Sequence, residues 1–479
     1  MDQITKHKLD QAAQELIASI DLSKVCELAS SFHVRKRACR ILSEWKKGSY
    51  NVCFPVIFDQ DTEVSEKWMV RIPLLPRLAF PEEKMRSEVA TMKYIAEKTT
   101  IPVPHLYGYS IKCDNILGLP FMLLEYIEGK TLFDIKLKNL EQNKREHLYA
   151  QLSDVYIQLY QQKFDRIGAL TLDEDDHHWV FVINNRPLTV DINEQEVSGL
   201  DICRYLHPHQ TFASTIDYVF FITRLIFNDF QRRRDSILSE NDARWYLYSI
   251  FASQSILMEW IKPEYNHGPF ILMHGDLRPP NIVIDDDFNL VSILDWEWSH
   301  TVPVQLFTPP FWLTNQAVLQ ISKDIPSLQY YAAVRRFCLS VYEQESRRYK
   351  LPLKDLPLTN LWRPHTIESL LIAHGLSNPH YFGNVYCDAL DQHYYGENPE
   401  ERMQAFFRIR KNQLHIVEQK ILEFAEFEKE RQELGVEKRV ALPYPTRTPQ
   451  EEAELVKKME AFYDSRHKVD ASAEIPQTA

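Results

Sequence analysis

Three polar side chains within residues 271–300 have the types and the order that phosphoryl transfer from a nucleotide requires. The stretch reads ILMHGDLRPPNIVIDDDFNLVSILDWEWSH, and it holds Asp276, then Asn281, then Asp295 after a second apolar run. In this chemistry one carboxylate lies near the acceptor hydroxyl, an Asn binds the metal, and a second carboxylate holds Mg²⁺ against the phosphates of ATP. The stretch therefore predicts a site that uses ATP and Mg²⁺.

The spacing of these residues explains how they can meet. Asp276 and Asn281 span one tight loop, so both side chains can point into the same space. The apolar runs NIVI and LVSIL can pair as a hairpin through the turn DDDFN, which would return Asp295 to the neighbourhood of Asn281. The simpler alternative is three ordinary polar residues around a β-turn, and the fixed order of the three is what favours a site.

Length and charge narrow the class of protein that could hold such a site. The chain has 479 residues, 44% of them hydrophobic, which is long enough for two lobes that share a cleft. Its 55 Lys and Arg against 67 Asp and Glu give a net charge of −12, which argues against a nucleic-acid partner and favours a neutral or cationic small molecule.

Seven scattered cysteines without a C-x-x-C pair predict neither a disulfide framework nor a zinc site. No run is apolar enough for a membrane span, and the acidic residues near the start favour the cytosol, with mitochondria left as the alternative.

Apolar periodicity predicts a small sheet with one helix, followed by a mainly helical region. Residues 33–80 alternate as three strands, and FPEEKMRSEVATMKYIAEKTT has the spacing of an amphipathic helix. Two more strands are expected in YGYSIKC and PFMLLEYI, and one long helix is expected over 399–434. A Pro-rich linker, a short helix and a disordered tail would follow it. The predicted divisions are a helical extension (1–32), a nucleotide-binding lobe (33–127), a lobe with the catalytic loop and acceptor site (128–435), and the tail (436–479).

The motif HGDLRPPN followed by ILDWE resembles the kinase-like phosphotransferases of the aminoglycoside phosphotransferase and choline kinase type, in the branch abundant in filamentous fungi. The resemblance covers roughly residues 33–430 and includes FDRIGALTLDE, NRPLTVD and VPVQLFTPPFWL. It implies an α+β, bilobal, protein-kinase-like fold with a small antiparallel-sheet lobe and a large, mainly helical lobe. It also implies that Asp276 is the catalytic base, that Asn281 and Asp295 are Mg²⁺ ligands, and that His274 orders the loop.

The same resemblance assigns residues on the nucleotide side of the cleft. The family's phosphate-covering turn corresponds to KKGSYN, which contains Gly48 and Ser49. Arg71 lies where a phosphate-pairing Lys often stands, and Glu88 would be the partner of that cation. The hinge, whose backbone would bind the adenine of ATP, consists of Glu125, Tyr126 and Ile127.

Two features depart from the family pattern. The turn has a single glycine, so fewer backbone N–H groups can approach phosphates without steric cost. Arg71 keeps the charge of a Lys but offers a planar fork that can grip phosphate oxygens in pairs. These departures favour a rival prediction, in which the chain is a catalytically weak or inactive kinase-like protein that binds a partner or serves as a scaffold.

Glu297 and Trp298 follow Asp295 directly, so their loop is expected to face the acceptor. Glu297 would hold a cationic or hydroxylated acceptor or else cap the next helix, and both alternatives stay open. The predicted activity is transfer of a phosphoryl group to a hydroxyl, less readily to an amine, of a small molecule such as a natural product. No oligomeric state is predicted.

Overall fold

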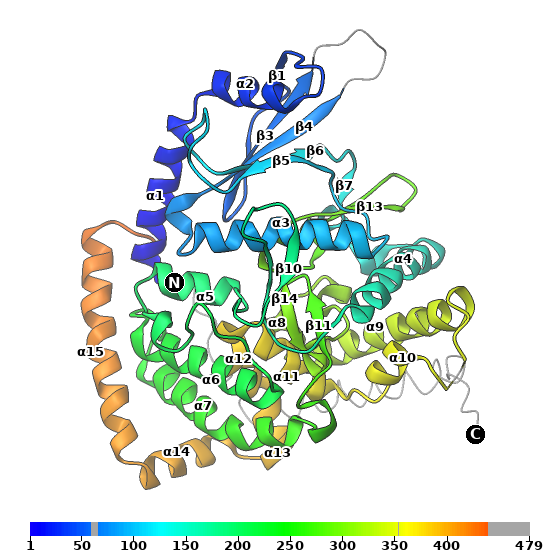
Figure 1. Ribbon diagram of the computed structural model, residues 1–479. Helices are drawn as coiled ribbons and strands as arrows, with labels where there is room; N and C mark the ends of the chain where they lie inside the picture. The colour runs from blue at the N-terminus through cyan, green and yellow to red at the C-terminus, as the bar shows by residue number, and fades with distance from the viewer. Residues whose placement is uncertain (59–65, 353, 439–479) are drawn as a thin grey trace.

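The computed structural model describes residues 1–58, 66–352 and 354–438. Its N-terminal lobe is built on an antiparallel sheet with the strand order β1-β3-β4-β6-β5, and β2 pairs with β3 at one end (Figure 1). The strands are β1 (Cys39–Ile41), β2 (Lys46–Lys47), β3 (Asn51–Phe58), β4 (Lys67–Pro73), β5 (Leu106–Ser110) and β6 (Phe121–Glu125). The strands expected in this region are therefore confirmed.

One face of this sheet packs into a hydrophobic core and the other faces the cleft between the lobes. Successive side chains of a strand alternate between the two faces. Val70 and Ile72 of β4 are buried in a core that the helices α1 (Gln3–Ser19) and α2 (Leu22–Phe32) cover. Arg71 lies between them in sequence and points the other way, toward the cleft between the lobes. The N-terminal helices thus stabilise the face of the sheet that does not contribute to the site.

One long helix, α3 (Pro81–Lys98), covers the cleft side of the sheet, as the apolar spacing predicts. Pro81 lies at its first turn with two acidic residues, and Lys98 lies at its last, an arrangement that suits the helix dipole. The buried residues Met85 and Val89 recur at a spacing of four and fix which face the helix presents. Glu88 consequently points back toward Arg71.

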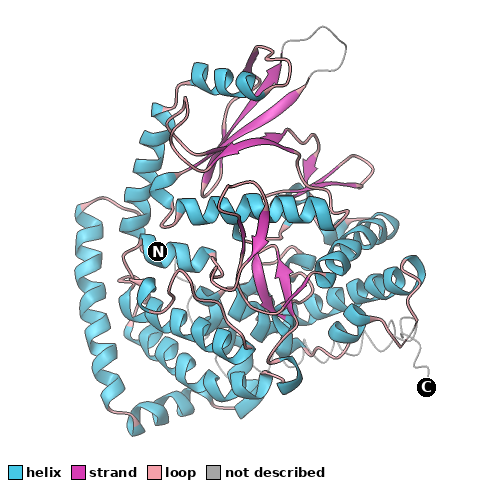
Figure 2. Ribbon diagram, viewed as in Figure 1, coloured by secondary structure: helices cyan, strands magenta, loops and turns pink. Residues whose placement is uncertain are grey.

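The second lobe is mainly helical (Figure 2). Its helices are α4 (Gln142–Gln161), α5 (Val190–Val197), α6 (Thr215–Arg232), α7 (Glu240–Trp260), α8 (Val318–Ile321), α9 (Asp324–Glu343), α10 (Pro357–Trp362), α11 (Ile367–Ser377), α12 (Phe382–Val385), α13 (Asp391–Tyr395), α14 (Pro399–Ile409) and α15 (Asn412–Glu433). The expected α+β fold, with a small antiparallel-sheet lobe and a large helical lobe, is confirmed. The placement of the boundary at residue 127 stays a prediction.

Short strands in the helical lobe flank the loops that contain Asp276, Asn281 and Asp295. One small sheet has the order β14-β11-β8 and the other the order β13-β12-β7, while β9 (Leu170–Leu172) and β10 (Trp179–Phe181) form a separate hairpin. The strands of the two small sheets are β7 (Lys130–Thr131), β8 (Lys163–Phe164), β11 (Phe270–Met273), β12 (Ile282–Ile284), β13 (Leu290–Ile293) and β14 (His300–Pro303). Because β12 and β13 pair antiparallel around the DDDFN turn, the predicted hairpin is confirmed.

The predicted long helix over 399–434 is wrong in one respect, since the structure has two helices there. α14 ends at Ile409 and α15 begins at Asn412, and the two meet at a sharp corner (Figure 1). Both helices pack against α7, so the corner lets each apolar stripe reach the same neighbour. The linker, short helix and tail expected after Lys438 lie outside the described residues. Within the described part, no helix combines the length and apolar character that crossing a bilayer requires.

Candidate active site

The loop after β11 is held in place by His274, which is fully buried. Its Nε2 lies 2.8 Å from the backbone carbonyl of Leu294, and its Nδ1 lies 3.3 Å from the backbone N–H of Asp276. The imidazole must therefore donate from Nε2 and accept at Nδ1, which is the neutral form. Burial lowers the pKa of His274 to about 4, consistent with that form. His274 thus ties the Asp276 loop to the chain segment that carries Asp295.

Gly275 allows this loop to pass close to the turn that ends at Trp298. Its φ is +81°, and a Cβ there would lie 2.2 Å from the backbone oxygen of Trp298. No other residue type fits both the dihedral and the contact. The glycine of the His-Gly-Asp motif is thus a requirement of the local backbone.

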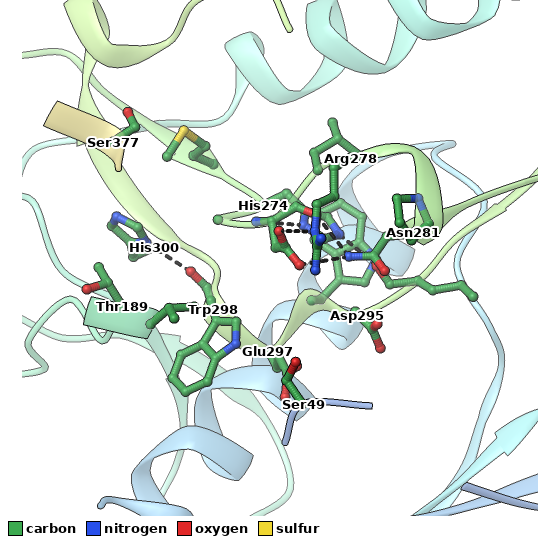
Figure 3. Close-up of a pocket in the computed structure, with 18 of the residues that line it drawn as sticks. Ser49, Thr189, His274, Arg278, Asn281, Asp295, Glu297, Trp298, His300 and Ser377 are labelled. Carbon is green, nitrogen blue, oxygen red and sulfur yellow. Dashed lines mark hydrogen bonds and ion pairs between the residues drawn. The ribbon is translucent and has the colours of Figure 1, made fainter. Parts of the chain in front are cut away.

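Asp276 is held at two oxygens by neighbours on its own loop. Its Oδ1 pairs with Arg278 Nε at 2.7 Å, and its Oδ2 accepts from Asn281 Nδ2 at 3.2 Å (Figure 3). Burial raises the pKa of Asp276, whereas the charge of Arg278 acts in the opposite direction. A carboxylate fixed in this way and only partly solvated meets the geometric requirement for the predicted base.

Asn281 and Asp295 lie side by side because of the β12–β13 pairing (Figure 3). Ile282 pairs with Ile293, and the N–H of Leu294 donates to the carbonyl of Asn281 at 2.8 Å. The Asn281 amide nitrogen donates to two oxygens of Asp276, which leaves its Oδ1 for another partner. The amide oxygen and the Asp295 carboxylate are hard oxygen ligands, and together they fit a Mg²⁺ ion that takes its other ligands from phosphates and water.

Arg71 connects this pair of ligands to the N-terminal lobe. Its Nη1 lies 2.6 Å from Glu88 Oε1, and its Nη2 lies 3.0 Å from Asp295 Oδ1 and 3.4 Å from Glu297 Oε2. Burial by itself would lower the pKa of Arg71, but the three carboxylates raise it above its usual value. The predicted partnership with Glu88 is present in the structure, and Arg71 also contacts a predicted metal ligand directly.

The carboxylate of Glu297 is bound by residues of the N-terminal lobe. It pairs with Lys84 Nζ at 2.5 Å and accepts from Asn51 Nδ2 at 2.8 Å, and the residue lines the cavity between the lobes. The expectation that it faces the acceptor or caps a helix stays a prediction. Burial by itself would raise its pKa, yet Lys84 and Arg71 hold the pKa of Glu297 below its usual range. The residue belongs to an ion cluster of Arg71, Lys84, Glu88, Asp295 and Glu297, in which all side chains are buried except that of Asp295, which is 41% exposed. The physical reason is that Lys84, one turn before Glu88 on α3, brings a second cation to this point.

The nucleotide side of the cleft contains the other predicted residues. Gly48 and Ser49 line the cavity, and a Cβ at Gly48 would meet only the backbone oxygen of Asn51 at an ordinary 3.7 Å. The hinge residues Glu125, Tyr126 and Ile127 line it as well. The N–H groups of Glu125 and Tyr126 already donate to the carbonyls of His105 and Lys67, at 2.8 and 3.3 Å.

The predicted site residues other than Glu88 border one cavity of about 950 Å³ between the lobes, and Lys84 and Glu88 do not line it. In Figure 3, Ser49, Glu297 and Asp295 lie below the loop that carries His274, Arg278 and Asn281, and Thr189, His300 and Ser377 lie to its left. Trp298, the second residue expected near the acceptor, lines this cavity, and its ring packs edge-on against Tyr50 at 5.0 Å.

Sequence reasoning missed three residues that hold the site together: Lys84, Asn51 and Arg278. The i,i+4 spacing of Lys84 and Glu88 on a predicted helix was a usable signal. Arg278 stands two residues after Asp276 in the motif itself. No pattern in the neighbouring sequence predicts the role of Asn51, because its partner Glu297 lies 246 residues away in the chain.

Comparison with known proteins gives a family match over the part that holds the site. The model of the phosphotransferase enzyme family matches residues 54–304. A relative named altered inheritance of mitochondria protein 9, mitochondrial, from Zygosaccharomyces rouxii, is 33% identical over 127 residues, which is 25% of this chain and 20% of that protein. Its namesake from Vanderwaltozyma polyspora is 24% identical over 319 residues, or 57% of this chain and 49% of that protein.

Both matches cover less than half of the relative's own length. The names of both relatives include a mitochondrial location, whereas the cytosolic location expected for this chain stays a prediction. Among solved structures, one of a putative aminoglycoside phosphotransferase from Ralstonia eutropha is similar at a TM-score of 0.45 and 14% identity, covering 84% of this chain and 98% of that one.

Proposed function

Because this chain belongs to the phosphotransferase enzyme family, we propose that it transfers the γ-phosphoryl group of ATP to a hydroxyl of a small molecule. The observation that carries the proposal is the convergence of Asp276, Asn281 and Asp295 on one cavity, with each side chain fixed by a named contact. A hydroxyl is preferred to an amine as the acceptor, because a carboxylate base suits a group that must lose its proton as it attacks.

The roles of the residues follow from their positions. Mg²⁺ bound by Asn281 Oδ1 and the Asp295 carboxylate would neutralise charge on the phosphates. The acceptor oxygen forms a bond to the γ-phosphorus while the bond from that phosphorus to the β,γ-bridging oxygen breaks, and ADP leaves. Asp276 takes the hydroxyl proton and later releases it to solvent, while Arg278 keeps the Asp276 carboxylate oriented.

The nucleotide would lie between the hinge and the ion cluster. Since Glu125 and Tyr126 use their N–H groups within the lobe, we assign the adenine contact to the N–H of Ile127. Arg71 would turn part of its fork from Asp295 to a phosphate oxygen, a geometry that a guanidinium suits. Glu88 stays its anchor, since that pair is buried and short.

A second candidate function is that of a binding protein without catalysis. The observation that favours it is the ion pair of Arg71 with Asp295 at 3.0 Å, which occupies a carboxylate oxygen that the metal would need. If the cluster keeps this pair in the presence of nucleotide, the site retains its shape and does not bind Mg²⁺.

The slow hydrolysis of ATP, in which water replaces the acceptor, tests the proposal without knowledge of the substrate. We expect the full chain to release ADP only with Mg²⁺, and Asp276→Asn to slow that release by roughly 100-fold or more. Asp286→Asn is the matched control, because Asp286 lies on the exposed DDDFN turn and, within the described residues, forms an ion pair only with exposed Lys130. Equal rates for Asp276→Asn and the wild type would remove Asp276 from the reaction. ATP binding without any hydrolysis would favour the second candidate.

A further inference from the structure

The acceptor side of the cavity is walled by an apolar face of α6. Tyr218, Phe221, Ile222 and Leu225 are spaced as i, i+3, i+4 and i+7, so they share one face of the helix, and all four line the cavity. Each is less than 8% exposed. An acceptor in this half of the cavity would therefore contact rings and branched alkyl groups rather than a hydrated polar surface.

Other parts of the lining continue this apolar character. Phe311 and Trp312 come from the segment after β14, and Tyr381 comes from the turn that follows α11. Trp312 also fixes the catalytic loop, because its indole N–H donates to the carbonyl of Leu277 at 2.7 Å. We call the part of the cavity between these residues and the apolar face of α6 the apolar chamber. It therefore adjoins the loop that carries Asp276.

Two buried histidines in this half, His300 and His374, contribute no positive charge. His300 donates from Nδ1 to the carbonyl of Trp298 at 2.9 Å and has its Nε2 3.3 Å from the Tyr218 hydroxyl. His374 has its Nε2 2.6 Å from the hydroxyl of Tyr330. Burial lowers the pKa of His300, and it lowers that of His374 to about 3. Both rings are neutral at physiological pH and act as polar but uncharged lining.

The acceptor half of the cavity also has few carboxylates among its described lining residues. Among the described residues that line the cavity, Asp191 and Glu194 are the only acidic ones outside the nucleotide side and the catalytic loops. Asp191 Oδ1 lies 3.5 Å from His380 Nδ1, and Glu194 Oε1 accepts from the Tyr50 hydroxyl at 3.0 Å. An acceptor with several ammonium groups would need several unpaired carboxylates, because desolvating each charge is costly without a partner.

We propose that the acceptor is an uncharged alcohol with a large apolar body, whose hydroxyl reaches Asp276 while the body lies against the apolar face of α6. This inference rests on the proposed function and narrows its substrate class. It separates this chain from phosphotransferases that act on polyamine sugars, since the apolar chamber replaces the carboxylates that such a substrate needs.

Calorimetric titration without nucleotide tests the inference with three probes. The first is 2-naphthaleneethanol, the second is the amine of the same shape, 2-naphthaleneethylamine, and the third is kanamycin, a polycation. We expect the alcohol to bind at least tenfold more tightly than the amine, and kanamycin not to bind. Tighter binding of the amine or of kanamycin, weakened by Asp191→Asn, would overturn the inference, and so would the failure of all three probes to bind.

Two variants locate the binding. Ser377 is exposed and lines the chamber, so Ser377→Trp should fill it and weaken the binding of the alcohol at least tenfold. Ser43→Trp places the same indole at an exposed serine outside the cavity and should leave the binding unchanged. Equal affinities for the two variants would place the alcohol elsewhere and contradict the inference.

The two proposals can fail separately. Asp276→Asn should still bind the alcohol although it no longer transfers phosphate. A wild type that binds the alcohol without any turnover of ATP contradicts the proposed function alone. A wild type that phosphorylates a hydroxyl of kanamycin but does not bind the alcohol contradicts the inference alone.

Discussion

Substituting Lys84 by Met removes one of the two cations in the ion cluster. Lys84 Nζ contacts Glu297 at 2.5 Å and Glu88 at 2.9 Å, and its side chain is 1% exposed. Three carboxylates then share Arg71 alone, and the net charge of the cluster changes from −1 to −2. Met keeps the length and most of the volume of Lys, so the loss of charge is the main change.

The expected loss in the free energy of unfolding follows from the burial of Glu88 and Glu297, the two carboxylates that lose Lys84 as a partner. One unit-charge contact at 4 Å is worth about 4 kcal/mol at an effective dielectric constant of about 20. Breaking a buried pair by removing one partner typically costs about 3–5 kcal/mol, because the remaining charge stays buried. We expect Lys84→Met to lower the free energy of unfolding by an amount in that range.

Urea unfolding followed by tryptophan fluorescence measures this loss, with Lys130→Met as the control. Lys130 pairs with Asp286 at 2.6 Å, nearly the same distance, but the two side chains are 64% and 85% exposed, so its removal should cost less than about 1 kcal/mol. The double variant Lys84→Met with Glu297→Gln should recover about half of the loss, because the unpaired charge is gone. A similar cost for the two Lys variants, or no recovery in the double variant, would refute the reasoning.

Three further predictions concern the catalytic loop. Gly275→Ala should lower the free energy of unfolding by at least about 2 kcal/mol in the same urea assay, since its φ is +81° and the new Cβ would overlap the backbone of Trp298; a neutral effect would contradict the loop geometry. Arg278→Ala should shift the acid limb of the ATP hydrolysis rate to higher pH, because Asp276 must be ionised and Arg278 counteracts the rise that burial causes in its pKa; an unchanged limb would separate Arg278 from the base. The neutral state of His274 stabilises the fold above pH 6.5, and that contribution is lost as the pH falls from 6.5 toward its folded-state pKa of about 4, a change worth about 3 kcal/mol. His274→Gln should therefore show a shallower loss of stability in urea over this pH window, and an identical slope would mean that His274 is charged in the folded state.

Local patterns in the sequence were sufficient to predict the strands of the N-terminal lobe, the helix α3 and the β12–β13 hairpin. The hairpin is a good example, since two apolar runs around a turn of Asp and Asn determine its register, and that register places Asn281 beside Asp295. Arg71 and Glu88 were paired through family resemblance, and the structure brings them to 2.6 Å.

Contacts between distant segments could not be predicted in the same way. Glu297 was expected to hold the acceptor or to cap a helix. Its contacts with Lys84 and Asn51, which come from other elements of the N-terminal lobe, were not predicted. The corner between α14 and α15 likewise depends on where α7 lies, and the apolar spacing of the two helices is continuous across it. Both features depend on tertiary packing, which local sequence patterns do not determine.

Calorimetric titration of ATP with and without Mg²⁺, for the wild type and for Asp295→Asn, tests the central claim most directly. The account predicts that Mg²⁺ strengthens the binding of ATP to the wild type at least tenfold, because Asn281 and Asp295 hold the ion against the phosphates. The strengthening should disappear in Asp295→Asn, while ATP alone binds both proteins to a similar extent. Binding that is indifferent to Mg²⁺ in the wild type, or an equal effect of Mg²⁺ on both proteins, would contradict the claim that this cleft carries metal-dependent phosphoryl transfer.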